Sequence, residues 1–462
     1  MLFFTVSYFV FFLCTLTCFY TFPVRFRKPL LLAASYFFYM SWNWKFIPLL
    51  LTLTIIDFVA AIWIEDRLGA RRKLALVVSL ASNLGFLGIF KYYNFAASNV
   101  ALLLGFPANR FYHDIVLPLG ISFHTFQSIS YVVDVYRGEQ KAIRKPLDYA
   151  LFIAFFPQLV AGPIVRARDF FRDLYTWKAP DSGEIKHGTF LVVLGLAKKV
   201  ALADNFALIS DRYFNAVASQ PGGAAAWGGV FAFAMQIYFD FSGYTDMAIG
   251  FARVLGFHFP VNFRQPYLAI SITDFWRRWH ISLSSWLRDY LYIPLGGNRD
   301  GKLMTYRNLM LTMLLGGLWH GANWNFMIWG AYHGAVLSLE RLFGQAKHRE
   351  RGWSIGDVPR ALFTFVLVSV GWVFFRAANV HDAFFVIGNM LRMPRGRWPV
   401  EPALMALAGI ALLAALWEDQ RPLLESVRRA PTWAVATCLG TLLFAVEIFG
   451  VEGNIPFVYF QF

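Results

Sequence analysis

Long apolar runs separated by short polar segments recur from one end of this 462-residue chain to the other. A helix that crosses a bilayer needs about 20 mostly apolar residues, and 2–22 meets this requirement without a charge. This run is too long for a signal-peptide core, and it lacks preceding basic residues and a small-residue cleavage site, so we interpret it as a span. Further spans are expected at 30–42, 47–64, 74–93, 113–135, 147–163, 189–210, 227–251, 306–338, 361–376, 382–391 with its neighbours, 402–417 and 432–450.

Several of these runs are short or interrupted by proline and glycine. Such segments are tolerated at membrane depth only where their backbone is buried in protein or lines a wet cavity. The pattern predicts an all-α polytopic membrane protein with about 10–12 transmembrane helices plus re-entrant and interfacial helices. We expect one membrane domain over 1–462, with N-terminal helices in 1–135, a motif-bearing core in 147–338, and C-terminal helices and a tail in 361–462.

Composition supports a membrane protein. Hydrophobic residues make up 58% of the chain and charged residues only 15%, whereas soluble domains carry about 25% charged residues. The mean hydropathy is +0.49. The three cysteines, Cys14, Cys18 and Cys438, have no metal-like spacing, so we expect neither a metal site nor a disulfide framework.

The net charge of +14 lies in short basic clusters between the apolar runs, at 25–28, 67–73, 137–145, 347–351 and 421–429. This distribution indicates the positive-inside signal, with attraction to anionic lipid headgroups or to an anionic cofactor, and not nucleic-acid binding. If all five clusters are cytoplasmic, the N-terminus lies outside the cell, and the tail that follows the last span lies outside as well.

One polar cluster falls inside an expected span, at 236–246. On a helix Gln236, Asp240 and Tyr244 share one face, and Ser242 and Asp246 occupy a neighbouring stripe. Carboxylates at membrane depth require partners or water. The cluster predicts either a polar lumen or a hydrogen-bonded network that holds helices together.

A second cluster, at 271–290, predicts an interfacial helix capped by Ser271 or Thr273. Trp279 belongs to its apolar stripe, and Arg277 lies on another face. The arginines of this helix are suited either to the phosphates of a nucleotide-like donor or to lipid headgroups. His280 lies beside the apolar stripe, where a structural role and a catalytic role are both open.

Two further segments carry candidate chemistry. Paired glycines beside Asn298 and Arg299 could admit an anion to backbone N–H groups, although such a signal is weak. His320 follows the apolar run 309–318 and is therefore expected at membrane depth. An imidazole can take a proton from a hydroxyl and return it. The alternative is a histidine that bridges helices, and His333, in a similar setting, competes for the catalytic role.

Six short sequence motifs occur along the chain in this order: VAGPIVR at 160–166, FDFSGYTD at 239–246, NFRQPY at 262–267, DFWRRWH at 274–280, YIPLGGNR at 292–299 and GLWHG at 317–321. Together they resemble the membrane-bound O-acyltransferase family, in its bacterial alginate O-acetyltransferase branch, and the resemblance covers almost the whole chain. It implies a funnel-shaped helical bundle in the bacterial inner membrane, with a tunnel across the bilayer. It also implies transfer of an acetyl group from a thioester donor, acetyl-CoA, to a hydroxyl, with no permanently bound cofactor.

By this resemblance His320 corresponds to the family's invariant histidine, the expected general base, and His280 to its second histidine. The resemblance and the polar clusters together indicate further residues of the tunnel or the donor site: Asp240, Tyr244, Asp246, Arg277, Arg278, Trp279, Asn298, Arg299, Trp319 and Asn323.

The tail is aromatic to its last residue. It is either part of an interfacial aromatic belt or a relay in which Tyr459 accepts the acetyl group for a periplasmic enzyme. With no SGNH-type catalytic domain fused to the chain, we expect a separate periplasmic acetyltransferase of that type, or a similar relay protein, to serve an exported polysaccharide such as alginate. The competing hypotheses are a transporter that uses Asp240 and Asp246 as coupling sites, and a scaffold for polymer export.

Overall fold

The computed structural model describes residues 1–159, 162–346, 348, 352–392, 397–451, 453 and 455–460. The regular elements among these residues are all helices. Five helical stretches in the described chain are long and apolar enough to cross a membrane: Val24–Asp66, Gly69–Leu103, Ile355–Arg376, Pro402–Gln420 and Thr432–Phe449. The prediction of an all-α polytopic membrane protein is therefore confirmed. The fold comprises two compact units, the first formed by 1–180 with 251–260 and the second by 181–250 with 261–462.

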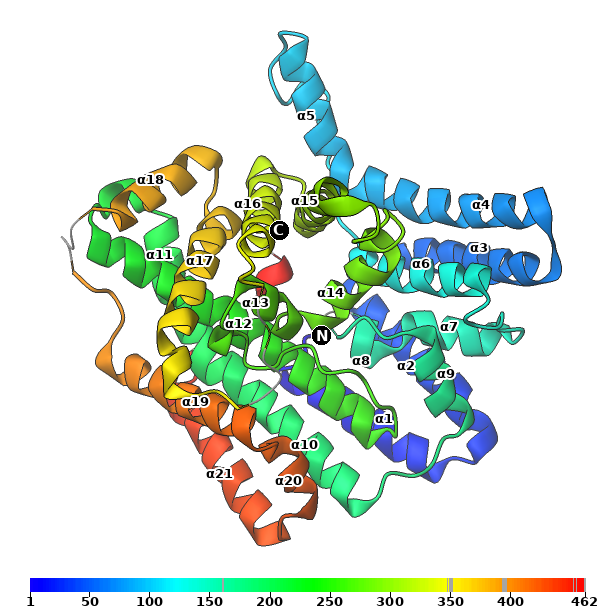
Figure 1. Cartoon of the computed structure of the whole chain (residues 1–462). Helices are drawn as coiled ribbons and strands as arrows, with labels where there is room; N and C mark the ends of the chain where they lie inside the picture. The colour runs from blue at the N-terminus through cyan, green and yellow to red at the C-terminus, as the bar shows by residue number, and fades with distance from the viewer. Residues whose placement is uncertain are drawn as a thin grey trace. The chain divides into compact units, whose positions relative to one another are not determined.

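Residues 1–180 of the first unit are coloured from blue to cyan-green in Figure 1, and its short segment 251–260 is green. Its helices are α1 (Val6–Thr21), α2 (Val24–Asn43), α3 (Ile47–Asp66), α4 (Gly69–Leu87), α5 (Tyr93–Leu103), α6 (Ile121–Arg137), α7 (Pro146–Ala154), α8 (Phe156–Leu159) and α9 (Ala167–Tyr175). A π-helical turn joins α4 to α5, which extends away from the other helices of this unit.

The expected span 113–135 is helical only from Ile121 onward. Gly120, just before α6, has a φ of +69°, which favours glycine, and a Cβ there would lie 2.4 Å from the carbonyl oxygen of Leu159. The close approach of α8 to this turn therefore sets where α6 begins.

The three early basic clusters meet at one end of the first unit. Arg144 pairs with Glu65 at 2.7 Å and with Asp66 at 2.5 Å. The Arg72 guanidinium lies 4.8 Å from the ring centroid of Tyr136. Lys28 pairs with Asp148 at 2.8 Å. These contacts place the three clusters on a common side of the helices, as the positive-inside argument requires. Most of the cluster at 347–351 lies outside the described residues.

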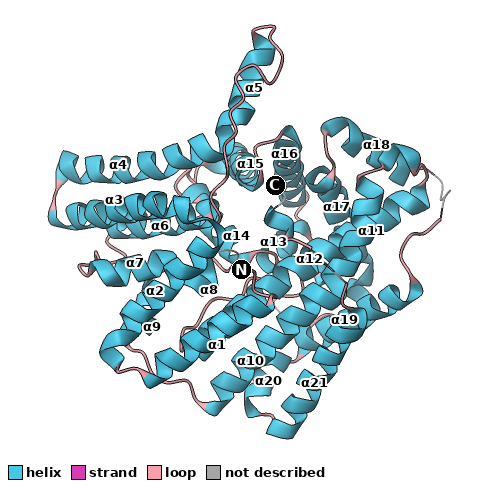
Figure 2. Cartoon of the chain, turned by 180° about the vertical axis from the view of Figure 1, so that it is seen from behind, coloured by secondary structure: helices cyan, strands magenta, loops and turns pink. Residues whose placement is uncertain are grey.

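The helices of the second unit, seen from behind in Figure 2, are α10 (Ser182–Ala197), α11 (Asp204–Phe214), α12 (Gly223–Val254), α13 (Ile272–Arg278), α14 (Ile281–Leu287), α15 (Gly301–His320), α16 (Trp324–Leu342), α17 (Val358–Arg376), α18 (Val380–Met390), α19 (Pro402–Gln420), α20 (Leu423–Arg429) and α21 (Thr432–Phe449). A π-helical turn, η3 (Lys198–Ala203), joins α10 to α11.

Helices α10 and α12 pack through glycines. A Cβ at Gly195 would lie 2.4 Å from the carbonyl oxygen of Gly243, and one at Gly250 would lie 2.5 Å from that of Gly188. Small residues let membrane helices approach this closely. The contact brings η3 against the polar cluster of α12.

The expected span 306–338 is a hairpin of two helices. Helix α15 ends at His320, and the Asn323 side chain accepts from the backbone N–H of Asn325 at 3.0 Å, so that it caps α16. The two helices lie side by side in both views. A Cβ at Gly317 would lie 2.2 Å from the carbonyl oxygen of Phe326, so glycine permits the contact.

The expected helix 271–290 begins as predicted, because the Ser271 hydroxyl accepts from the backbone N–H of Asp274 at 3.0 Å. It does not continue unbroken. His280 has a φ of 43° and a ψ of 54°, a left-handed conformation that ends α13 and starts α14 in a new direction.

Candidate active site

His320 is the last residue of α15, and its side chain is surrounded by aromatic rings. Its ring centroid lies 4.9 Å from that of Trp319, 5.1 Å from Trp329 and 5.2 Å from Phe375. The residue is only 6% exposed. Because α15 ends here, the imidazole lies at the turn between α15 and α16.

His280 shares this setting, since its ring centroid lies 6.3 Å from that of Trp319. Its Nδ1 lies 3.2 Å from the side-chain oxygen of Asn262. The same oxygen accepts from the backbone N–H of Ser282 at 3.1 Å and from its hydroxyl at 2.9 Å. An acceptor at Nδ1 implies that the ring carries its proton there. Burial lowers the pKa of His280 to about 3, so the ring is neutral at pH 7.

The C-terminal tail brings a hydroxyl to the same place. The described part of this tail comprises residues 455–460. The ring centroid of Tyr459 lies 5.6 Å from that of His320, and Phe241 lies 4.7 Å from Tyr459 and 4.6 Å from His280. The Tyr459 hydroxyl is buried, with no hydrogen-bond partner among the described residues. Burial raises the pKa of this phenol above its ordinary value.

The carboxylates of α12 are paired with lysines of η3. Asp240 lies 2.9 Å from the amine of Lys199, and Asp246 lies 2.6 Å from that of Lys198. Tyr244 is fully buried, and its ring centroid lies 4.5 Å from that of the tail residue Phe457. The polar cluster of α12 thus contacts η3 and the tail.

Residues 82–351 match the membrane-bound O-acyltransferase family. A probable alginate O-acetylase of Pseudomonas putida is 42% identical to this chain, with 95% of each chain covered. The chain belongs to the membrane-bound O-acyltransferase family. A peptidoglycan O-acetyltransferase of Helicobacter pylori is 40% identical over 79% of this chain and 74% of its own. A teichoic acid D-alanyltransferase of Bacillus subtilis is 28% identical over 58% of this chain and 71% of its own.

The protein is accordingly a multi-pass membrane O-acyltransferase. Such an enzyme must bring an acyl donor and a hydroxyl to a base in a site that excludes bulk water. Among the described residues, the cluster of His320, His280, Trp319 and Tyr459 combines buried imidazoles with a buried hydroxyl, and we treat it as the candidate active site.

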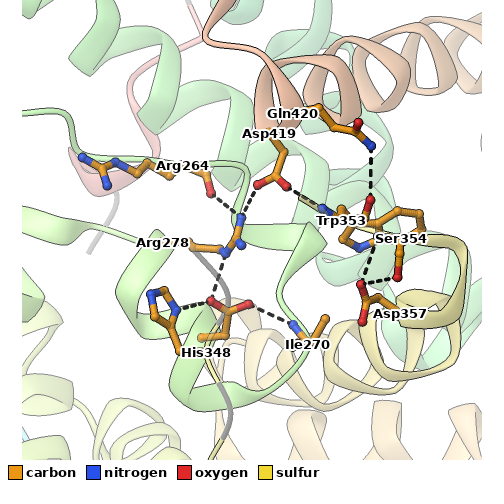
Figure 3. A network of polar contacts seen from close by, with 10 residues as sticks. Arg264, Ile270, Arg278, His348, Trp353, Ser354, Asp357, Asp419 and Gln420 are labelled. Atoms are coloured by element: carbon orange, nitrogen blue, oxygen red, sulfur yellow. Dashed lines mark hydrogen bonds and ion pairs between the residues drawn. The ribbon is translucent and has the colours of Figure 1, made fainter. Parts of the chain in front are cut away.

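In this acyltransferase Arg278 lies in an internal ion network (Figure 3). Its guanidinium binds Asp274 at 3.0 Å and Asp419 at 2.7 Å. His348 Nδ1 lies 2.7 Å from Asp274, and the backbone N–H of Trp353 donates to Asp419 at 3.2 Å. Trp279, the next residue, is buried and stacks against Phe275. The network ties α13 to α19 and to the chain segment before α17.

The remaining predicted donor residues lie apart from the ring cluster. Arg277, Asn298, Arg299 and Asn323 are all exposed. Asn298 accepts from Arg341 at 3.0 Å, and Asn323 caps α16. Their assignment to the tunnel or the donor site stays a prediction.

His333, the competing histidine, lies beyond Trp329. Its ring centroid is 4.9 Å from that of Trp329 and 5.2 Å from that of Trp276, and the side chain is fully buried. Its ring contacts within the described chain are with aromatic residues of α13 and α16 and not with the tail. The position of Tyr459 therefore favours His320 over His333 as the base.

Sequence reasoning missed Asn262, Phe241 and Lys199. Asn262 opens the NFRQPY phrase, which was noted without a role for any residue. The signal for Lys199 was available, because Lys198 and Lys199 interrupt an apolar run at 189–210, and charges at membrane depth call for partners. Nothing in the local pattern around Phe241 distinguishes it from a core residue.

Proposed function

We propose that this acyltransferase passes an acetyl group from a cytoplasmic thioester donor, acetyl-CoA, across the bacterial inner membrane. The acetyl group would then O-acetylate an exported polysaccharide such as alginate through a periplasmic partner. Relatives named as an alginate O-acetylase and a peptidoglycan O-acetyltransferase support an acetyl group and an envelope polymer.

The observation that carries this proposal is the contact between Tyr459 and His320. The buried hydroxyl belongs to a tail phenol that lies beside a buried imidazole, with ring centroids 5.6 Å apart. The proposal requires the hydroxyl to form a hydrogen bond with the imidazole when the donor binds, and catalytic contacts are often long before substrate binds.

In the proposed step the Tyr459 oxygen attacks the thioester carbonyl as His320 removes the phenolic proton. A bond forms between this oxygen and the acetyl carbon, and the carbon–sulfur bond of the donor breaks. The thiolate takes the proton from the imidazolium and leaves as the free thiol. Base assistance matters here because burial raises the pKa of the Tyr459 phenol. Trp329 Nε1, buried and without an acceptor among the described residues, is a candidate donor to the developing oxyanion.

A relay of this kind would explain how the acetyl group reaches the side of the membrane opposite its donor. The donor is cytoplasmic and the polymer is outside, so the acetyl group must cross although coenzyme A does not. Three basic clusters at one end of the first unit support a cytoplasmic assignment for that end. If the late clusters are cytoplasmic as well, the positive-inside rule places both termini outside. An acetylated Tyr459 would then be presented to an SGNH-type or similar partner on the periplasmic side.

The transporter hypothesis gains no support from the carboxylates on which it relied. Asp240 and Asp246 are each within 3 Å of a lysine amine, at 2.9 Å and 2.6 Å. Both ion pairs join η3 to α12, and the pair of Lys199 and Asp240 also contacts the tail.

The test is mass spectrometry of the purified protein after incubation with isotopically labelled acetyl-CoA. We expect the label on the C-terminal peptide, its loss in Tyr459→Phe, and a roughly 10²- to 10⁴-fold slower appearance in His320→Ala. Tyr332→Phe is a matched control, because that hydroxyl donates to the carbonyl of Leu367 at 2.8 Å, and it should keep the label. If cells that carry Tyr459→Phe acetylate the polymer fully, the relay hypothesis is refuted, and the assignment as an acyltransferase is unaffected.

A further inference from the structure

A buried ion group holds the tail in place. Lys199 lies between two carboxylates, 2.9 Å from Asp240 and 2.7 Å from Asp204. Its amine also donates to the backbone carbonyl of Ile455 at 3.0 Å. Asp240 uses its other oxygen to accept from the backbone N–H of Val458 at 2.6 Å. Two charged side chains therefore form hydrogen bonds with main-chain atoms of the tail, at two residues that are three positions apart.

The burial of this group makes these bonds strong. Lys199 is 1% exposed and Asp240 is 2% exposed. Hydrogen bonds to charged groups are worth roughly twice those between neutral groups, and screening by water is weak at buried sites. One lysine faces two carboxylates here, and the backbone N–H of Val458 gives Asp240 a second hydrogen-bond donor.

We propose that Lys199 and Asp240 are positioning residues that clamp the tail so that Tyr459 lies against His320. The consequence for catalysis rests on the proposed function, whereas the clamp itself does not. Both contacts go to backbone atoms, so the clamp sets the path of the tail independently of its side chains. Phe457 packs on Tyr244 and Phe241, and this packing orients the part of the tail that carries Tyr459.

The neighbouring ion pair offers a matched control. Lys198 and Asp246 join the same two elements, η3 and α12, at 2.6 Å. Neither is recorded in contact with the described tail. Asp240→Asn and Asp246→Asn are therefore the same isosteric change on the same helix, and only the first weakens the hold on the tail.

The experiment measures release of the tail directly. Val458 is fully buried, and a cysteine there keeps the backbone N–H. Val458→Cys is placed in a protein with Cys14→Ala, Cys18→Ala and Cys438→Ala, and the rate of maleimide labelling is measured in detergent. We expect Asp240→Asn to raise this rate roughly tenfold, because a neutral acceptor replaces a charged one. Asp246→Asn should leave the rate within about twofold, since its contact does not touch the tail.

The second readout is acetylation of Tyr459 in the native tail at increasing labelled acetyl-CoA. Asp240→Asn should lower the maximal rate roughly tenfold without changing the donor concentration for half-maximal rate, since the donor site is intact. An equal labelling rate in Asp240→Asn and in its parent, the Val458→Cys protein without the native cysteines, or an equal rise in Asp240→Asn and Asp246→Asn, would overturn the clamp. Labelling that responds as expected, with Tyr459 never acetylated, would refute the relay and leave the clamp standing.

Discussion

At the scale of single residues, His280 has an unusual, left-handed backbone conformation. It and Gln265 are the non-glycine residues with positive φ in the described chain, both at 43°. Such conformations cost of order 1–3 kcal/mol and persist where surrounding contacts enforce them. Asn262 provides those contacts, because its side-chain oxygen binds both His280 and Ser282.

Asn262→Ala should therefore disturb the conformation of His280, although the two residues are 18 positions apart in the sequence. We expect a loss of about 1–3 kcal/mol of stability, because buried donors at residues 280 and 282 lose their acceptor, and slower acetyl transfer as the His280 ring loses its orientation. Thermal unfolding and labelled-acetyl transfer measure the two effects. Ser282→Ala, which removes only the hydroxyl donor, is the milder comparison, and equal effects of the two changes would count against this role of Asn262.

At the scale of elements, the α15–α16 hairpin depends on glycine where the backbones meet. A Cβ at Gly317 would lie 2.2 Å from the carbonyl oxygen of Phe326 and 3.2 Å from Gly330. At Gly316 the nearest atom is a terminal methyl of Leu287, at 3.1 Å, which can move. The hairpin in turn sets the position of His320 at its turn.

Gly317→Ala should destabilise the protein by about 1–3 kcal/mol, because overpacking against a backbone cannot be relieved by a rotamer change. Gly316→Ala is the matched control and should cost clearly less. Denaturation midpoints of the two variants in detergent make the comparison. If Gly316→Ala proved the more damaging, the close backbone contact would not be the reason for glycine at 317.

The network around Arg278 joins α13 to α19, and removing its centre should be costly. Arg278→Met would leave Asp274 and Asp419 as buried charges without their guanidinium, at a cost of about 3–5 kcal/mol. Arg277→Met changes the exposed neighbour and should lie within about 0.5 kcal/mol of the unmodified protein. Thermal unfolding measures both, and a near-neutral Arg278→Met would show that the network is dispensable.

At the scale of the whole molecule, the distribution of basic clusters predicts orientation. Exposed Lys141 lies in the loop that contacts the 65–73 cluster, and exposed Asn109 follows α5, beyond the other end of α4. In cysteine-free protein in intact cells, a membrane-impermeant maleimide should label Asn109→Cys and not Lys141→Cys. Lys141→Cys should react only after the membrane is permeabilised. The opposite pattern would contradict the predicted orientation, in which the clusters at 67–73 and 137–145 are cytoplasmic.

The sequence by itself determined the class of this protein and much of its chemistry. Apolar runs predict membrane-spanning helices, because the backbone N–H and C=O groups must hydrogen-bond to one another inside a bilayer. The six ordered motifs indicate the acyltransferase family. The cap at Ser271 was also predictable, since an N-cap bond depends on local sequence.

Tertiary structure decided what gathers around His320. Val458 and Asp240 are 218 positions apart, and no periodicity or spacing could pair them. The break at His280 was equally hidden, because it depends on Asn262, 18 positions earlier. Local patterns report which residues prefer a helix or an apolar setting, whereas the partner of a buried charge is decided only when distant segments pack together.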